Sequence, residues 1–157
     1  MTDPDLDNVD AWRGPTASQA SGLTLAAARR MIAAAQGEAR SLRVAMSVAI
    51  VDAGAQLVAF ERMDGADLVG IGLAQDKAWT ALVNRMPTGE LAPLVQPGAE
   101  FYGYDSVAGG RMIVFAGGMP LERNGVLSGA VGVSGGSAAE DQRAVEAAVR
   151  AFGEGGG

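Results

Sequence analysis

The sequence predicts an α+β fold, a two-layer sandwich in which helices pack against a five-stranded antiparallel sheet. Two groups of apolar, strand-like segments are each joined by short turn signals, as expected for neighbouring antiparallel strands. Segments with apolar residues at helical spacing precede, separate and follow these groups. Hairpins that alternate with helices in this way favour one antiparallel sheet with helices packed against it.

At 157 residues, the chain has the length of one domain with a substantial core. We expect this domain to cover residues 22–152, between a mobile tail at 1–21 and a loose tail at 153–157. Hydrophobic residues make up 48% of the chain but aromatic residues only 5%, so the core should consist mainly of Ala, Val, Leu, Ile and Met. The 23 glycines predict tight turns and close approaches between backbone segments.

The first part of the domain predicts one helix followed by a hairpin. Thr24 is positioned as the N-cap of a helix that runs to about Ser41, with apolar residues along one face. Residues 44–51 and 56–62 are apolar, strand-like segments, and Asp-Ala-Gly at 52–54 turns the chain between them. These two segments should pair as an antiparallel hairpin.

The middle of the chain predicts mainly helix. A second helix is expected over residues 67–83, after a turn at 63–66. Pro87 ends this element, because proline disfavours helix in the residue before it. Thr88 is placed to cap a short helical turn at 89–95, and residues 100–107 form an irregular segment with three aromatic residues.

Residues 109–136 predict a three-stranded meander. Apolar runs at 112–116 and 126–133 predict two strands, and a short strand lies between a glycine kink at 117–118 and a polar turn. Asn124–Gly125 is the strongest hairpin signal in the chain, because both residues tolerate positive φ. Ser137 is expected to cap a closing helix that runs to about Phe152.

Charge and composition narrow the classes of function. A net charge of −6 and the absence of basic runs argue against nucleic acid or an anionic membrane as a partner. The chain has no cysteine, which excludes disulfides and zinc–thiolate sites, and no histidine, the usual general base and haem ligand. The acidic, polar N-terminal stretch lacks the features of a secretory signal, and no apolar run is long enough to span a membrane, so we expect a cytoplasmic protein.

Four motifs carry a family resemblance that spans residues 23–152. These are RMDGA at 62–66, KAWTA at 77–81, GGMPL at 117–121, and SGAVGVSGG at 128–136 with Glu140 and Asp141 after it. In order and spacing they resemble the GlcG/HbpS-like family of haem-binding-related proteins, and also the C-terminal domain of PduO-type corrinoid adenosyltransferases. The resemblance implies a PAS/profilin-like shape and self-association to dimers or higher closed oligomers. It also implies binding of haem or a related small-molecule cofactor.

Haem binding by this chain would depend on ligands other than histidine. Tyr102 and Tyr104 offer phenolic oxygens, and a methionine such as Met63 or Met119 offers a thioether. A hydrophobic slot without strong ligation is the remaining alternative. The tyrosines lie near a glycine-rich segment and are therefore candidate pocket residues.

An enzymatic alternative rests on charged residues. Arg62 is a candidate to bind a carboxylate and Asp64 to orient it or to move a proton, although Asp64 equally suits a helix cap or turn. Lys77 lies on an otherwise apolar helix face, where it is either desolvated for anion binding or base chemistry, or extends to solvent. Glu140 is a candidate general base, although a capping role at the start of the closing helix also explains it. No metal site is predicted.

The segment Gly117, Gly118, Met119 and Pro120 is the candidate binding loop. Glycines expose backbone N–H groups that suit a carboxylate or an oxyanion, whereas a β-bulge that bends a strand is the structural alternative. With Arg62, Asp64 and Lys77, this loop would serve a small catabolic enzyme that acts on a carboxylated metabolite. Its chemistry would be proton transfer of the isomerase, hydratase or lyase type.

Overall fold

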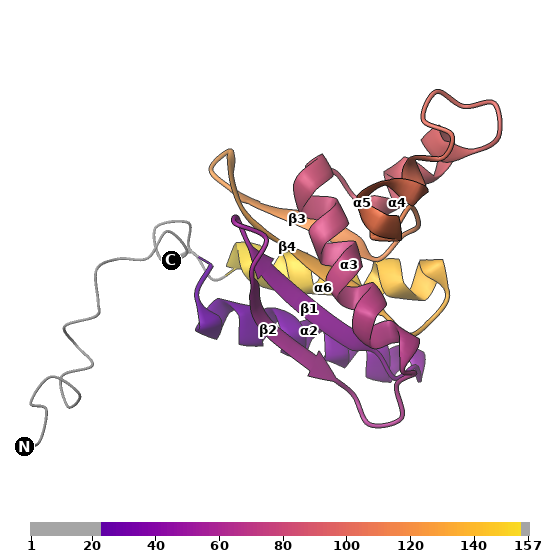
Figure 1. Ribbon diagram of the computed structural model, residues 1–157. Helices are drawn as coiled ribbons and strands as arrows, with labels where there is room; N and C mark the ends of the chain where they lie inside the picture. Colours follow the sequence, from indigo (N-terminus) through magenta and orange to yellow (C-terminus); the bar gives the residue numbers. More distant parts are fainter. Residues whose placement is uncertain (1–22, 155–157) are drawn as a thin grey trace, which may run out of the picture.

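The computed structural model describes residues 23–154, so the predicted tail at 1–21 and most of that at 153–157 lie outside the described residues. The elements follow one another in the order that Figure 1 shows. They are α2 (Leu25–Leu42), β1 (Ser47–Asp52), β2 (Leu57–Arg62), α3 (Val69–Asn84), α4 (Thr88–Leu91), η2 (Ala92–Val95), η3 (Tyr104–Ser106), α5 (Val107–Gly110), β3 (Gly118–Arg123), β4 (Val126–Ser134) and α6 (Ala138–Glu154).

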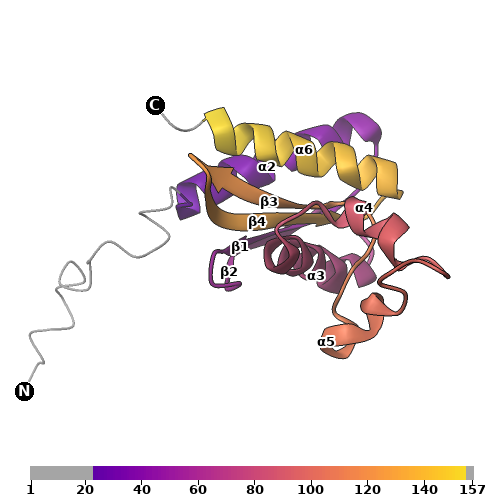
Figure 2. The same cartoon turned by 90° about the horizontal axis from the view of Figure 1, so that it is seen from above.

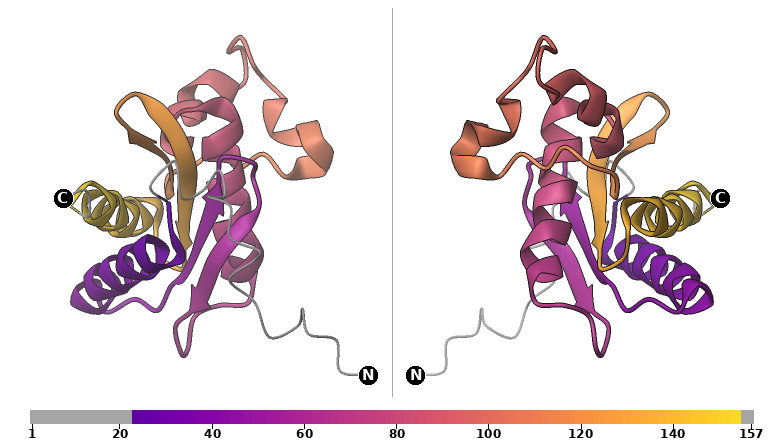
Figure 3. Two further views of the ribbon diagram at one scale, coloured as in Figure 1. Left: turned by 90° about the vertical axis from the view of Figure 1, so that its left-hand side faces the viewer. Right: turned by 90° about the vertical axis from the view of Figure 1, so that its right-hand side faces the viewer.

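The strands form one antiparallel sheet with the order β2-β1-β4-β3. Seen from above, α2 and α6 cover one face of the sheet and α3 covers the other (Figure 2). The views from the two sides agree with this arrangement (Figure 3). The α+β class and the antiparallel sheet are therefore confirmed. The prediction of five strands is wrong, because the sheet of the described residues has four, and helices on both faces make three layers rather than two.

The strand predicted at 112–116 is absent because its backbone bonds to side chains instead of to another strand. The N–H of Ile113 donates to Thr80 Oγ1 at 3.0 Å, and the hydroxyl of Thr88 donates to the carbonyl oxygen of Phe115 at 2.7 Å. Thr88 also accepts from the N–H of Gly118 at 2.9 Å. It therefore ties the segment before β3 to the start of α4. The predicted capping role of Thr88 is wrong, because Thr88 is the first residue of α4 and its hydroxyl bonds to Phe115 and Gly118 instead of to the helix.

The other turn and cap signals are found where they were predicted. Thr24 Oγ1 accepts from the N–H of Ala27 at 3.1 Å and caps α2. Asn124 (φ 53°) and Gly125 (φ 75°) connect β3 to β4 in the left-handed conformations that a tight hairpin requires. None of the helices within residues 23–154 has both the length and the apolar character needed to cross a membrane.

Small residues let α3 lie very close to the sheet. The inner face of α3 carries Ala74, Ala78 and Ala81, which pack with Ala49 and Ala130 of the sheet. At the centre of this contact is Gly132 of β4, where a Cβ atom would collide with the carbonyl oxygen of Ala74. The glycine thus sets the distance between helix and sheet.

We expect Gly132→Ala to destabilise the protein by about 1–3 kcal/mol or more, because the added methyl group must push α3 off the sheet. Gly37→Ala is the matched control. Gly37 lies in α2 with open space around its Cα, so the same added methyl group should stabilise the helix by about 0.5–1 kcal/mol. Urea denaturation measures both changes. If the two substitutions changed the free energy of unfolding equally, Gly132 would not set the distance between α3 and the sheet.

Candidate ligand site

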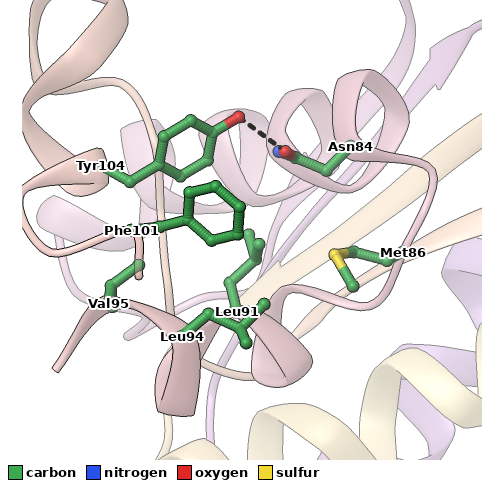
Figure 4. Close-up of a pocket in the computed structure, with 7 residues that line it drawn as sticks. All are labelled: Asn84, Met86, Leu91, Leu94, Val95, Phe101 and Tyr104. Carbon is green, nitrogen blue, oxygen red and sulfur yellow. Dashed lines mark hydrogen bonds between the residues drawn. The ribbon is translucent and has the colours of Figure 1, made fainter. Parts of the chain in front are cut away.

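An apolar cavity of about 290 Å³ lies at the C-terminal end of α3. Its walls come from the end of α3, from α4 and η2, and from the segment that leads into η3 (Figure 4). The residues that line it are Asn84, Met86, Leu91, Leu94, Val95, Phe101 and Tyr104. Most of these side chains are apolar, as is usual for sites that bind small molecules with an apolar body.

Short-range features of the backbone position the walls of this cavity. Arg85 adopts a left-handed conformation (φ 53°) that ends α3. The short helices α4 and η2 follow, and the spacing of Leu91, Leu94 and Val95 places these side chains on one side of them. The N–H of Phe101 donates to the carbonyl oxygen of Leu94 at 3.0 Å, which returns the aromatic segment to this apolar surface.

The polar end of the cavity is a tyrosine held by the last turn of α3. The Tyr104 hydroxyl donates to Asn84 Oδ1 at 2.8 Å, and Asn84 Nδ2 donates to the carbonyl oxygen of Thr80 at 2.9 Å. The rings of Phe101 and Tyr104 form a tilted pair with centroids 6.1 Å apart. Asn84 therefore fixes the phenol at the edge of an otherwise apolar wall (Figure 4).

Both tyrosines that the sequence predicted as ligand-binding residues line an open surface hollow, but only one of them lines the apolar cavity. Tyr104 lines the cavity. Tyr102 is 69% exposed and does not line it. The other lining residues were not predicted from the sequence. Two sequence features could have pointed to them. These are the three aromatic residues at 100–107 and the helical spacing of the apolar residues in LAPLV at 91–95.

Lys77 is buried in an ion pair rather than extended to solvent. Its side chain is fully buried, and its Nζ lies 2.5 Å from Asp141 Oδ2. Nζ also donates to the carbonyl oxygen of Val133 at 3.0 Å and lies 4.8 Å from the centre of the Phe115 ring. Burial lowers the pKa of Lys77 and raises the pKa of Asp141, and the hydrogen bond between the two groups opposes both shifts.

Gly117 and Gly118 pack against this ion pair. A Cβ atom at Gly117 would lie 2.7 Å from Lys77 Nζ, and one at Gly118 would collide with the backbone oxygen of Lys77. The N–H of Gly118 is already donated to Thr88. Gly118, Met119 and Pro120 belong to β3, where they pair with Gly132, Val131 and Ala130 of β4. The segment predicted as a binding loop is therefore mostly a strand, and it lies beside Lys77.

Arg62 and Asp64 lie at the opposite edge of the sheet. With Gln36, Arg40 and Met63 they line a polar hollow of about 360 Å³. Arg62 pairs with Ser47 of β1, and Ser47 pairs with Ser134 of β4, so two strand spacings, or about 10 Å, separate Arg62 from the strand whose Val133 carbonyl oxygen accepts from Lys77. Lys77 does not line the hollow at Arg62 and Asp64. The helix cap considered for Asp64 is made by Asp67, whose Oδ1 accepts from the N–H of Gly70 at 2.8 Å.

Glu140 forms a capping box with Ser137. Glu140 Oε2 accepts from the N–H of Ser137 at 2.8 Å and from its hydroxyl at 2.9 Å, and Ser137 Oγ accepts from the N–H of Glu140 at 3.3 Å. The hydrogen bonds from the Ser137 backbone and side chain lower the pKa of Glu140. A general base at neutral pH benefits from a raised carboxyl pKa, so this environment favours the capping role.

We expect Lys77→Met to lower the free energy of unfolding by about 3–5 kcal/mol, because Asp141 would remain buried without its partner. The double variant K77M/D141N should recover most of the loss. Asparagine is neutral, and its side-chain oxygen can still accept from the N–H of Gly136, as Asp141 Oδ1 does at 2.9 Å. Urea denaturation at pH 7 measures all three proteins. A single variant K77M as stable as the wild type would contradict the assigned role of the ion pair.

The chain matches the family model described as "Haem degrading protein HbpS-like" over residues 23–150. It is 38% identical over 136 residues to an uncharacterized 15.0 kDa protein of Citrobacter freundii from the dhaT-dhaS intergenic region, covering 87% of this chain and 96% of that protein. It is 39% identical over 137 residues to the corrinoid adenosyltransferase PduO of the same organism, covering 87% of this chain but 41% of that longer protein.

Solved structures show the same relationship. The crystal structure described as a PduOC:Heme complex has a TM-score of 0.80 and 40% identity, and the alignment covers 82% of this chain and 94% of that one. Residues 23–150, which the family model matches, contain the whole sheet, α2, α3, most of α6 and the residues that line the cavity at Tyr104. The chain therefore belongs to the HbpS-like family, as its four motifs predicted.

Proposed function

We propose that this protein binds a small, flat and mostly apolar ligand in the cavity at Tyr104, and that haem is the first candidate. The observation that carries the proposal is the cavity itself, whose apolar walls end in one anchored phenol. A relative with 40% identity over most of its length has been solved in complex with heme. The polar hollow at Arg62 and the buried Lys77 offer no comparable apolar surface.

The residues of the cavity fit a haem group in two respects. The walls are apolar, and Tyr104 and Met86 provide an oxygen and a sulfur atom that can ligate iron. If haem binds here, Tyr104 and Met86 would be the residues that hold its iron, and the apolar lining residues would contact the rest of the group. A volume of about 290 Å³ is at the lower end for ligand sites, so the cavity would enclose only part of a haem group. Haem, when bound, supplies redox chemistry at its iron.

Hemin titration of tag-free protein tests this proposal. The affinity tag must be removed, because a histidine tag would supply imidazole ligands that the chain lacks. We expect a saturable, sharp Soret band at about one haem per subunit or per dimer. Tyr104→Phe should weaken binding about tenfold or more and change the Soret band, because it removes the oxygen ligand while keeping the ring.

Tyr102→Phe is the matched control, because Tyr102 is a neighbouring tyrosine that does not line the cavity. It should bind hemin like the wild type. Equal losses in the two variants, or broad absorption that never saturates in the wild type, would contradict haem binding at Tyr104.

Self-association is the second part of the proposal. α3 is apolar around most of its circumference, a property of helices that are covered on all sides. Yet Leu68 (76% exposed) just before it, Val69 (63%) at its start and Val83 (46%) near its end are open to solvent. A second copy of the chain would cover them.

We expect sedimentation velocity to give a mass of two or more subunits for the wild type. The double substitution L68D/V69D should reduce it to one subunit without loss of helical circular dichroism, because the charges would lie in the contact. A wild type that sediments as a monomer at micromolar concentration would refute self-association.

A further inference from the structure

The hydrogen bonds around Asn84 determine which way its amide faces. Asn84 Nδ2 donates to the carbonyl oxygen of Thr80 at 2.9 Å and to Met112 Sδ at 3.2 Å. Both partners can only accept, so the amide nitrogen must face them, and both of its hydrogens are used. Asn84 Oδ1 is therefore the atom that faces Tyr104.

This orientation leaves Tyr104 without a hydrogen for the ligand. A phenol has one hydrogen, and Tyr104 donates it to Asn84 Oδ1 at 2.8 Å. The remaining electron pairs of the Tyr104 oxygen are free to accept. If the phenol turned its hydrogen toward a ligand instead, Asn84 Oδ1 would lose its donor.

The other polar side-chain atoms of the cavity also offer no hydrogen. Met86 contributes a thioether, which can only accept. The backbone N–H groups of Met86, Phe101 and Tyr104 are donated to the carbonyl oxygens of Ala81, Leu94 and Phe101, respectively. The side chains of Leu91, Leu94, Val95 and Phe101 are apolar. The lining side chains thus present electron pairs and apolar surface, and no free donor.

Building on the proposed function, we propose that this cavity selects flat apolar ligands that present an electron-pair acceptor to the Tyr104 oxygen. An N–H or O–H hydrogen on the ligand meets this requirement. Ligands that present only an ether, carbonyl or carboxylate oxygen at this position are disfavoured. Asn84 acts as a positioning residue, because it sets this preference through Tyr104.

Two probes with the same ring system test the selectivity. 2-Naphthol carries an O–H group, and 2-methoxynaphthalene carries a methyl group in place of that hydrogen. Isothermal titration of the full chain should give about fivefold tighter binding of 2-naphthol, the worth of one net hydrogen bond. Tyr104→Phe should abolish the preference by weakening only 2-naphthol. Asn84→Leu should shift the preference toward 2-methoxynaphthalene, because the phenol hydrogen becomes free to donate.

The outcomes separate this inference from the proposed function. If both probes bind the wild type equally well, or if Tyr104→Phe keeps the preference, the selectivity is overturned while the cavity remains a ligand site. If neither probe binds the wild type, the selectivity is overturned, and the hemin titration decides the proposed function separately. Thermal unfolding of each variant confirms that it is folded, and Tyr104→Phe decides the question even if Asn84→Leu does not fold.

Discussion

The ion pair between Lys77 and Asp141 joins helices that lie on opposite faces of the sheet. Lys77 belongs to α3 and Asp141 to the first turn of α6, where a carboxylate also complements the helix dipole. Both charges are buried, so each depends on the other, and further hydrogen bonds to Val133 and Gly136 satisfy the remaining polar atoms. The position of α3 on the sheet follows from this pair together with the small residues beneath it.

The candidate ligand site depends on the same helix. Asn84, which anchors Tyr104, lies seven residues after Lys77, or about 10 Å along the helix axis. Gly132, Gly117 and Gly118 remove side chains that would push α3 or its lysine away from β4 and β3. The interactions that fix α3 therefore also fix the polar end of the cavity, although none of these glycines contributes an atom to its lining.

Much of the fold could be predicted because its signals are local. The Thr24 cap, the Asn124–Gly125 turn and the Ser137–Glu140 capping box each depend on residues within a few positions of one another. The prediction of a strand at 112–116 was wrong because the structure of this segment depends on residues far away in the chain. Its apolar pattern is typical of a strand, but the hydroxyl groups of Thr80 and Thr88, more than twenty residues away, bond to its backbone.

The sequence by itself determined the family, the α+β class, the caps and turns, and the absence of a histidine ligand. It also marked Lys77 and Tyr104 as residues of interest. Only the tertiary structure decided that Lys77 is buried against Asp141, that Arg62 lies at the far edge of the sheet, and that Tyr104 but not Tyr102 lines the apolar cavity. These outcomes depend on contacts between residues far apart in the chain, and local spacing carries no information about which of them meet.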